Sequence, residues 1–196
     1  MKITNLSFQH TEEAPYFFKD LAFELEPGLI HALHGKNGVG KSVLMNLLSQ
    51  YEGVALMNQK FDQTLAPPFS FLENLQFGQL KYRPGPFSRL PTPHIHAELL
   101  ERFQIDPALP VSLLSGGQRQ IVALLMKLQK KTTVLLLDEP TAALDEQNAI
   151  MVFEFLKTLP RTTILIVCHD YDLVSRYTTG SHLHLKVGDD GLRYLE

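Results

Sequence analysis

Apolar and polar positions along the chain follow two patterns, one typical of strands and the other of helices. Three short runs are almost wholly apolar, as expected for central strands of a parallel sheet covered on both faces: 29–33, 133–137 and 163–167. A stretch with helical periodicity follows each run: 42–50, 146–159 and 170–177. A strand followed by a helix, three times over, predicts an α/β fold with right-handed crossovers.

The two ends of the chain predict further strands. Alternating patterns at residues 2–8 and 21–26 are typical of half-buried strands, and residues 181–195 predict a hairpin that turns at 188–191.

A mostly helical stretch, 71–130, interrupts the strand series and contains a proline-rich loop at 83–93. We therefore expect a single domain, 1–196, with an inserted lobe. Its core comprises about 1–58 and 131–196, and the helical lobe lies within about 59–130.

A glycine-rich loop lies between the first apolar run and the first predicted helix. Its residues match G-x-x-x-x-G-K-[ST] in the strand-loop-helix context that this motif requires: Gly35, Lys36, Asn37, Gly38, Val39, Gly40, Lys41 and Ser42. Convergent backbone N–H groups bind phosphate, Lys41 reaches the terminal phosphates, and the Ser42 hydroxyl is a ligand for Mg²⁺. The loop predicts a nucleoside triphosphate site that extends to Val43.

An acidic pair, Asp138 and Glu139, ends the second apolar run. Carboxylates at the C-terminal edge of a parallel strand lie where open α/β sheets bind ligands. We expect Asp138 to hold Mg²⁺ and Glu139 to orient or deprotonate the attacking water. A pair that merely caps the next segment is the alternative, but the phosphate loop upstream favours the metal.

Composition and charge exclude several classes of protein. The net charge of -3, from 18 Lys+Arg and 21 Asp+Glu, gives no reason to expect a nucleic acid partner. No apolar run approaches the roughly 18–20 residues that span a bilayer, and the N-terminus lacks the features of a signal peptide. Cys168 is the single cysteine, which fits a reducing compartment. We therefore expect a cytoplasmic protein.

Further motifs resemble those of ATP-binding cassette (ABC) ATPases, in the order that the family has. Leu114 to Gln118 resemble the signature motif, Asp145 resembles the D-loop aspartate, and His169 resembles the switch histidine. Gln59 resembles the Q-loop glutamine, and Gln63 in the same loop is the alternative; the strand pattern that ends at Gln59 favours Gln59. The resemblance covers nearly the whole chain.

The resemblance implies a P-loop NTPase fold: a RecA-like parallel core, an inserted helical subdomain and an antiparallel β-subdomain. The β-subdomain is expected to be reduced, because only residues 51–53 separate the phosphate-loop helix from the next strand. The resemblance also implies ATP and Mg²⁺ as cofactors, with Ser42, Gln59 and Asp138 as metal ligands. Glu139 and His169 become the catalytic residues, His169 as a sensor of the γ-phosphate.

A second copy of the chain is implied as well. In this family the signature motif and D-loop face the nucleotide held by the other subunit, in a C2 head-to-tail dimer. The residues that would contact ATP in this way are Ser115, Gly116, Gly117, Gln118 and Asp145. From the residues alone, Ser115 and Asp145 are typical N-caps of the helices that follow them, and both roles are compatible.

His10 falls where the family has an aromatic that stacks on adenine, with Tyr16 or Phe17 as alternatives.

The function expected is an ATP-binding and ATP-hydrolysing subunit of an ABC transporter that dimerises on ATP. It would couple to separate integral membrane subunits at the inner face of a membrane, docking near the apolar residues Pro67, Pro68, Phe69 and Phe71. The alternative is a soluble ABC ATPase that acts on ribosomes or DNA, which the lack of coiled-coil heptads disfavours. The pairs His94/His96 and His182/His184 lack the further ligands that a metal site needs, so we expect them to be structural.

Overall fold

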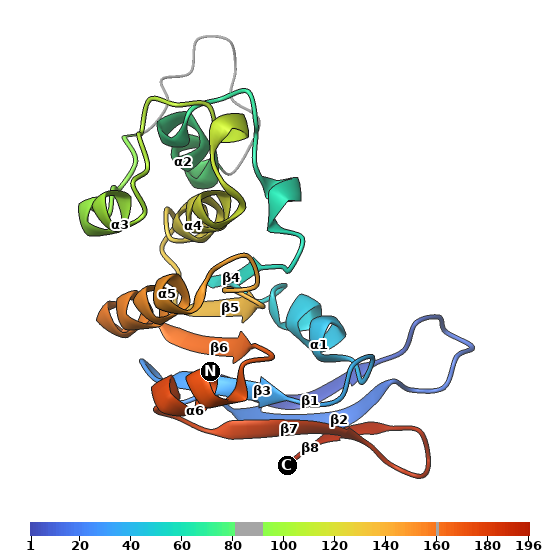
Figure 1. Cartoon of the computed structure of the whole chain (residues 1–196). Helices are drawn as coiled ribbons and strands as arrows, with labels where there is room; N and C mark the ends of the chain where they lie inside the picture. Colours follow the sequence, from blue (N-terminus) through green and yellow to red (C-terminus); the bar gives the residue numbers. More distant parts are fainter. Residues whose placement is uncertain (81–91, 160) are drawn as a thin grey trace.

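The computed structural model describes residues 1–80, 92–159 and 161–196. In the described residues one sheet has eight strands in the order β1-β2-β8-β7-β3-β6-β5-β4 (Figure 1). The strands are β1 (Lys2–Phe8), β2 (Phe18–Glu24), β3 (Ile30–His34), β4 (Val54–Met57), β5 (Val134–Asp138), β6 (Thr163–Val167), β7 (His182–Val187) and β8 (Arg193–Leu195). The helices are α1 (Lys41–Leu48), α2 (Phe71–Gln79), α3 (Ala97–Arg102), α4 (Gly116–Lys127), α5 (Glu146–Thr158) and α6 (Tyr171–Tyr177), with 3₁₀ turns η1 (Phe61–Thr64) and η2 (Val111–Leu113).

The centre of the sheet is parallel and covered on both faces. Strands β7, β3, β6, β5 and β4 run in the same direction, and every residue of β5 and β6 is buried. Alternate side chains of β5 enter different cores: Leu135 and Leu137 pack with the helices α4 and α5, whereas Val134 and Leu136 pack towards α1. Two covered faces explain why these strands are apolar throughout.

The outer strands curl around α1. Strands β1 and β2 are antiparallel, as are β7 and β8, and Figure 1 shows them forming the lower part of the molecule. The apolar face of α1, made of Leu44, Met45 and Leu48, is fully buried between these strands and the parallel strands. Each such side chain stabilises the fold by about 1.5–3 kcal/mol, so α1 and the loop before it are firmly held.

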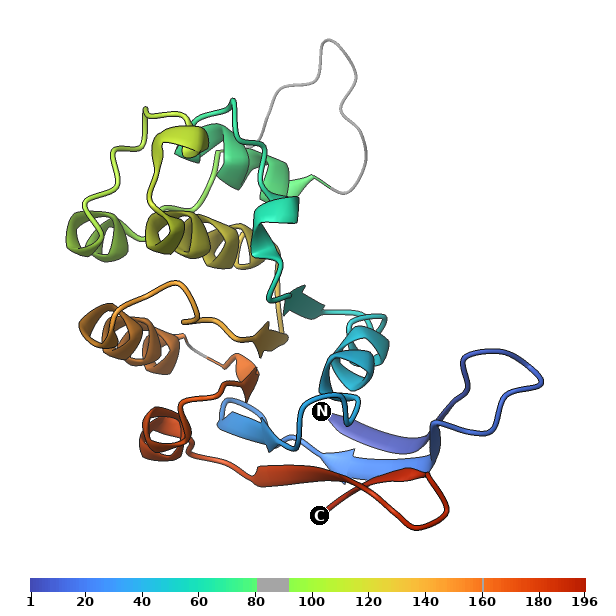
Figure 2. The same cartoon turned by 45° about the vertical axis from the view of Figure 1, so that its right-hand side comes forward.

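The helices α2, α3 and α4 form a lobe beside the β4 edge of the sheet, and α4 packs against the sheet (Figure 2). Buried Asn74 fastens the loop that leads into this lobe, because its amide bonds the backbone of Ala66, Phe69 and Ser70. Ser70 then starts α2 with a capping box that includes Glu73. None of the described helices has the length and apolar composition needed to span a membrane.

The predicted α/β architecture is confirmed, and most predicted elements begin and end within a few residues of those observed. The predicted strand at 21–26 is shifted, since β2 covers Phe18–Glu24, and the last helix of the helical stretch predicted to reach 130 ends at Lys127. The proline-rich loop falls largely on residues 81–91, outside the described part. Phe71, predicted to offer docking surface, is fully buried in the lobe, whereas Phe69 is 44% exposed. The division into core and lobe remains a prediction.

Candidate functional site

The phosphate loop connects β3 to α1. Gly40 is the N-cap of α1 with a φ of 113°, and a Cβ there would lie 2.6 Å from Cε1 of Phe17, so only glycine fits. The Lys41 Nζ donates to the carbonyls of Gly35 (2.7 Å) and Lys36 (3.2 Å), which holds the ammonium group against the loop. The first N–H groups of a helix lack intrahelical acceptors, so this end of α1 favours an anion.

A cavity of about 500 Å³ opens in front of this helix. It is lined by Phe17, Asn37, Gly38, Gly40, Lys41, Ser42, Val43, Gln59, Asp138, Glu139, Val167 and His169. Most predicted nucleotide and metal residues therefore meet in one place, including Gln59, whereas Gln63 does not line the cavity. Gly35, Lys36 and Val39 line a neighbouring cavity on the β7–β8 side of the loop instead.

Three oxygen-bearing side chains of the cavity are suited to Mg²⁺. The Ser42 hydroxyl donates to Oδ2 of Asp138 at 2.9 Å, and Gln59 lines the same cavity. Hydroxyl, carboxylate and amide oxygens are the ligands that Mg²⁺ prefers, so this donor set fits the metal.

The described residues contain no group of three or more His, Cys, Asp or Glu arranged to hold a metal. His182 instead bonds His34 at 2.9 Å, and His94 and His96 pack edge to face.

Glu139 follows β5 in an unusual backbone conformation. Its φ is 56°, which is costly for a non-glycine residue, and its N–H donates to Val167 O at 2.8 Å. The carboxyl group is 8% exposed; Oε2 accepts from the His169 N–H at 3.3 Å, and Oε1 lies 3.4 Å from His169 Nε2. Burial raises the pKa of this carboxyl, and the nearby His169 opposes the rise. A buried carboxylate oxygen without a hydrogen-bond donor is a suitable acceptor for a water proton.

Gln120 holds the backbone of the loop that carries Glu139, and no sequence motif identifies it. The side chain is buried in α4; its Nε2 donates to Glu139 O at 3.0 Å, and its Oε1 accepts from the Ala143 N–H at 3.1 Å. One amide thus connects the signature helix with the loops that carry Glu139 and Asp145. The sequence does carry one signal for Gln120, because it is a polar residue directly before the apolar run 121–126.

Phe17 is the aromatic ring that lines the cavity. The Arg193 guanidinium stacks 3.8 Å from its centroid, and the ring of His10 packs edge-on at 5.0 Å. His10 does not line the cavity, so among the candidates for the adenine-stacking residue the geometry favours Phe17. The contact with Arg193 is a cation–π interaction that fixes the ring plane.

The signature and D-loop residues lie away from this cavity in the same chain. Ser115 is exposed at the start of α4, in the helical lobe, whereas the phosphate loop belongs to the sheet (Figures 1 and 2). Its side chain caps α4 by accepting from Gln118 N, and the exposed Asp145 caps α5 by accepting from Asn148 N. The Gln118 Nε2 donates hydrogen bonds to the carbonyls of Phe103 and Gln104 within the lobe. Gly117 passes close to Leu144, since a Cβ there would lie 2.7 Å from its Cδ2.

Comparison with known proteins adds independent evidence. A family model described as ABC transporter matches residues 18–55 and 52–142. A ribose import ATP-binding protein of Rubrobacter xylanophilus is 31% identical over 74% of this chain, and this chain spans about a third (34%) of that relative. The structure of cbiO1 from Clostridium perfringens, part of an ABC transporter complex, has a TM-score of 0.72 at 24% identity, covering 98% of this chain and 85% of that one. The dimeric cassette MJ0796, bound to ADP and Pi, has a TM-score of 0.68 at 22% identity and coverages of 97% and 95%.

Proposed function

Because this chain belongs to the ABC transporter family, we propose that it binds ATP with Mg²⁺ and hydrolyses it to ADP and phosphate, to power a transporter. The observation that carries the proposal is one cavity that unites the phosphate loop, the Ser42–Asp138 pair and the buried Glu139 carboxyl. Relatives named as import ATP-binding proteins favour transport over action on ribosomes or DNA.

The chemistry follows from the positions of these side chains. Loop N–H groups and Lys41 bind the phosphates, and Ser42, Asp138 and Gln59 would hold Mg²⁺. The metal, when bound, offsets the negative charge of the phosphate oxygens. Glu139 accepts the proton of the attacking water through Oε1, which accepts no hydrogen bond within the described residues, and His169, whose Nε2 lies 3.4 Å from that oxygen, fixes the orientation of the carboxylate. Phe17 supports the base by stacking.

The site is completed by a second copy of the chain. Ser115, Gly116, Gly117 and Asp145 lie outside the cavity of their own chain, at positions that an antiparallel partner could present to the nucleotide. The N-terminus of α4 carries a partial positive charge that favours the phosphates. A neighbour of the same fold is described as dimeric. We infer a C2 head-to-tail dimer that closes on ATP and opens after hydrolysis, with coupling to membrane subunits on the cytoplasmic side.

Replacement of Glu139 by glutamine tests the proposed reaction. Glu139→Gln removes the base but keeps the size of the side chain, so ATP binding should remain while phosphate release falls to background. The control is Glu98→Gln, an exposed residue of α3, which should hydrolyse ATP like the wild type. Unchanged turnover in Glu139→Gln would remove Glu139 from its role, and failure of the wild type to bind ATP would overturn the function itself.

A further inference from the structure

Arg193 contacts Phe17 through both its backbone and its side chain, although it belongs to none of the nucleotide-binding motifs. Strand β8 lies beside β2 in the sheet, with Arg193 in register with Phe18. The Arg193 N–H donates to Phe17 O at 3.2 Å, and the guanidinium carbon lies 3.8 Å from the centroid of the Phe17 ring. One residue of the C-terminal hairpin thus holds both the backbone and the ring of Phe17.

The Arg193 guanidinium is held by this ring and not by an acidic side chain. Among the described residues it forms no salt bridge, and its Nη1 donates to Gly191 O at 2.7 Å. Its Nε is buried and finds no acceptor in the described part of the chain. A buried donor without an acceptor costs free energy, so another contact must offset that cost. Stacking of the planar guanidinium on an aromatic ring is a contact of this kind.

Arg193 lies behind Phe17 as seen from the nucleotide cavity, because Phe17 lines that cavity and Arg193 does not. The guanidinium therefore covers a part of the ring that does not open on the cavity. The ring is confined from other directions as well: the Gly40 backbone leaves no room for a Cβ beside its Cε1, and His10 packs against it at 5.0 Å. The ring cannot turn away from the cavity without breaking these contacts.

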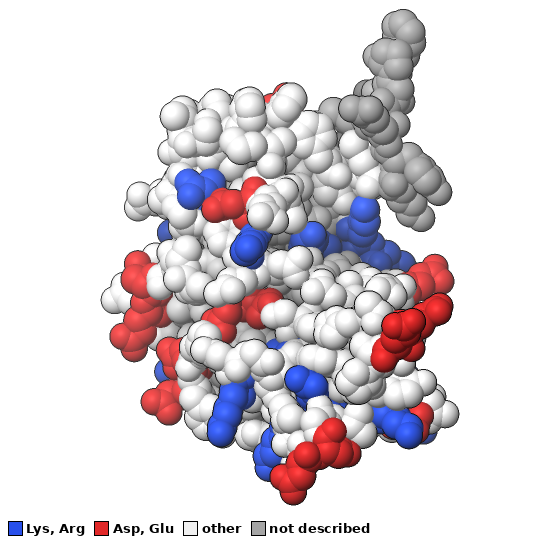
Figure 3. All heavy atoms as spheres, turned by 90° about the vertical axis from the view of Figure 1, so that its right-hand side faces the viewer, with Lys and Arg blue, Asp and Glu red and all other residues white. Residues whose placement is uncertain are grey.

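The contact with Arg193 is separate from the part of the cavity that would bind the phosphates, which belongs to β3 and α1. Figure 3 shows the side of the molecule towards which β3, β5 and β6 point, and Lys and Arg side chains there are mixed with Asp and Glu. The whole chain has a net charge of -3, and salt screens exposed charges beyond about 8–10 Å. A long-range attraction between Arg193 and the phosphates is therefore expected to be weak.

We propose that Arg193 is a positioning residue for the nucleobase, which fixes the plane of Phe17 so that a base can stack on the side facing the cavity. A platform that is already ordered loses little conformational entropy when the base binds, which strengthens binding. Arg193 therefore raises the affinity for the base and does not affect phosphate binding or hydrolysis. This role rests on the proposed function, because Phe17 is a base platform only if the cavity binds a nucleotide.

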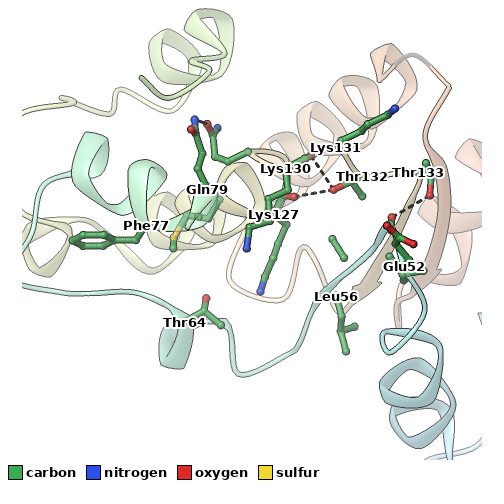
Figure 4. A pocket seen from close by; sticks show the side chains of 16 residues that line it. Glu52, Leu56, Thr64, Phe77, Gln79, Lys127, Lys130, Lys131, Thr132 and Thr133 are labelled. Atoms are coloured by element: carbon green, nitrogen blue, oxygen red, sulfur yellow. Dashed lines mark hydrogen bonds between the residues drawn. The ribbon is translucent and has the colours of Figure 1, made fainter. Parts of the chain in front are cut away.

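Arg193→Met tests this role, since methionine keeps a flexible apolar chain but lacks the planar charged group. Its Kd for ATP by calorimetry and its KM should rise about threefold, whereas kcat at saturating ATP should equal that of the wild type. Inorganic triphosphate, which has no base, should bind the variant and the wild type with the same Kd. The matched control is Lys131→Met, which also removes one positive charge and should bind ATP like the wild type. Lys131 lines a separate cavity of about 1110 Å³ that shares no residue with the nucleotide cavity (Figure 4).

A double-mutant cycle with Phe17→Ala separates positioning from a structural role of β8. Without the ring Arg193 has nothing to position, so adding Arg193→Met to Phe17→Ala should not change the Kd for ATP further. A purely structural role would weaken ATP binding by the same factor in both backgrounds. If Arg193→Met folds poorly, Arg193→Lys keeps the charge but loses the planar stack; it should raise the Kd about twofold and show the same dependence on Phe17.

Three results would each overturn the role of Arg193: an unchanged Kd for ATP in the variant, an equal loss of affinity for inorganic triphosphate, or an equal loss in the Phe17→Ala background. Calorimetry needs no turnover, so these results are distinct from a failure of the proposed function. A chain that binds ATP with the expected coupling but does not hydrolyse it would refute only the proposed hydrolysis. Hydrolysis by the wild type with an unchanged Kd in Arg193→Met would refute only the role of Arg193.

Discussion

Substitution of Gln120 changes the support of the loop that carries Glu139 and leaves every proposed nucleotide-binding residue unchanged. Gln120→Met keeps the length and volume of the side chain but removes the hydrogen bonds to Glu139 O and Ala143 N. The Glu139 carbonyl then loses its partner in a buried setting, which costs about 1–3 kcal/mol, whereas the partly buried Ala143 N–H loses less. For a chain of this size, a loss of about 1–3 kcal/mol lowers Tm by roughly 2–12 °C.

The effect on catalysis should exceed the effect on binding. Glu139 holds a left-handed backbone conformation, and Gln120 is one of the groups that maintain it. A displacement of the carboxylate by about 1 Å lowers kcat by up to about 100-fold, whereas the KM for ATP should stay within about twofold. Steady-state hydrolysis, ATP binding by calorimetry and thermal unfolding separate the three quantities.

Gln120→Glu is the matched control, since Glu still accepts from Ala143 N but cannot donate to Glu139 O when ionised. It should lower kcat as Gln120→Met does, because it leaves the same carbonyl unbonded. A variant Gln120→Met with a lowered Tm and an unchanged kcat would refute the reasoning and leave Gln120 with a purely structural role.

Four further outcomes are expected. Because burial raises the pKa of Glu139, the base form is lost at higher pH than for an ordinary glutamate, so kcat should fall on acidification with a midpoint above 4.5; a midpoint below 4.5 in a pH–rate profile would contradict this. Because the pKa of Glu139 is raised, ionised Glu139 destabilises the folded chain once the pH exceeds that pKa. The Tm of Glu139→Gln should therefore lie above that of the wild type at pH 8, and this difference should disappear towards pH 4. Calorimetry that shows the reverse trend would refute this. Phe17→Ala should raise the KM for ATP about tenfold while His10→Ala changes it little, and equal effects in kinetic assays would refute the assignment of the base platform. Removal of Mg²⁺ by EDTA should abolish hydrolysis, and re-addition should restore it; turnover in EDTA would exclude the roles given to Ser42 and Asp138.

The parts of the site that the sequence predicted are those encoded by contiguous residues. The loop from Gly35 to Ser42 and the pair after β5 each lie in one segment, and their strand and helix context is visible in the hydrophobic pattern. The strand pattern predicts Gln59 rather than Gln63, and Gln59 lines the cavity although β4 itself ends at Met57.

The contacts that the sequence could not predict join distant segments. Gln120 meets Glu139 through the packing of α4 on the sheet, and Arg193 reaches Phe17 only because β8 pairs with β2. Neither contact leaves a periodic signal.

The central claim is that each active site combines the phosphate loop of one chain with the signature motif of the other. Two inactive variants test it when mixed: Lys41→Ala, which cannot bind the phosphates, and Ser115→Asp, which still caps α4 but repels the nucleotide. In a mixed dimer one site receives both intact halves, and the Asp faces the disabled loop.

The decisive measurement is the ATPase rate of this equimolar mixture against each variant alone. Half of randomly paired dimers are mixed and each has one intact site of two, so the account predicts recovery to about a quarter of the wild-type rate. A mixture that stays as inactive as its components would contradict the head-to-tail dimer.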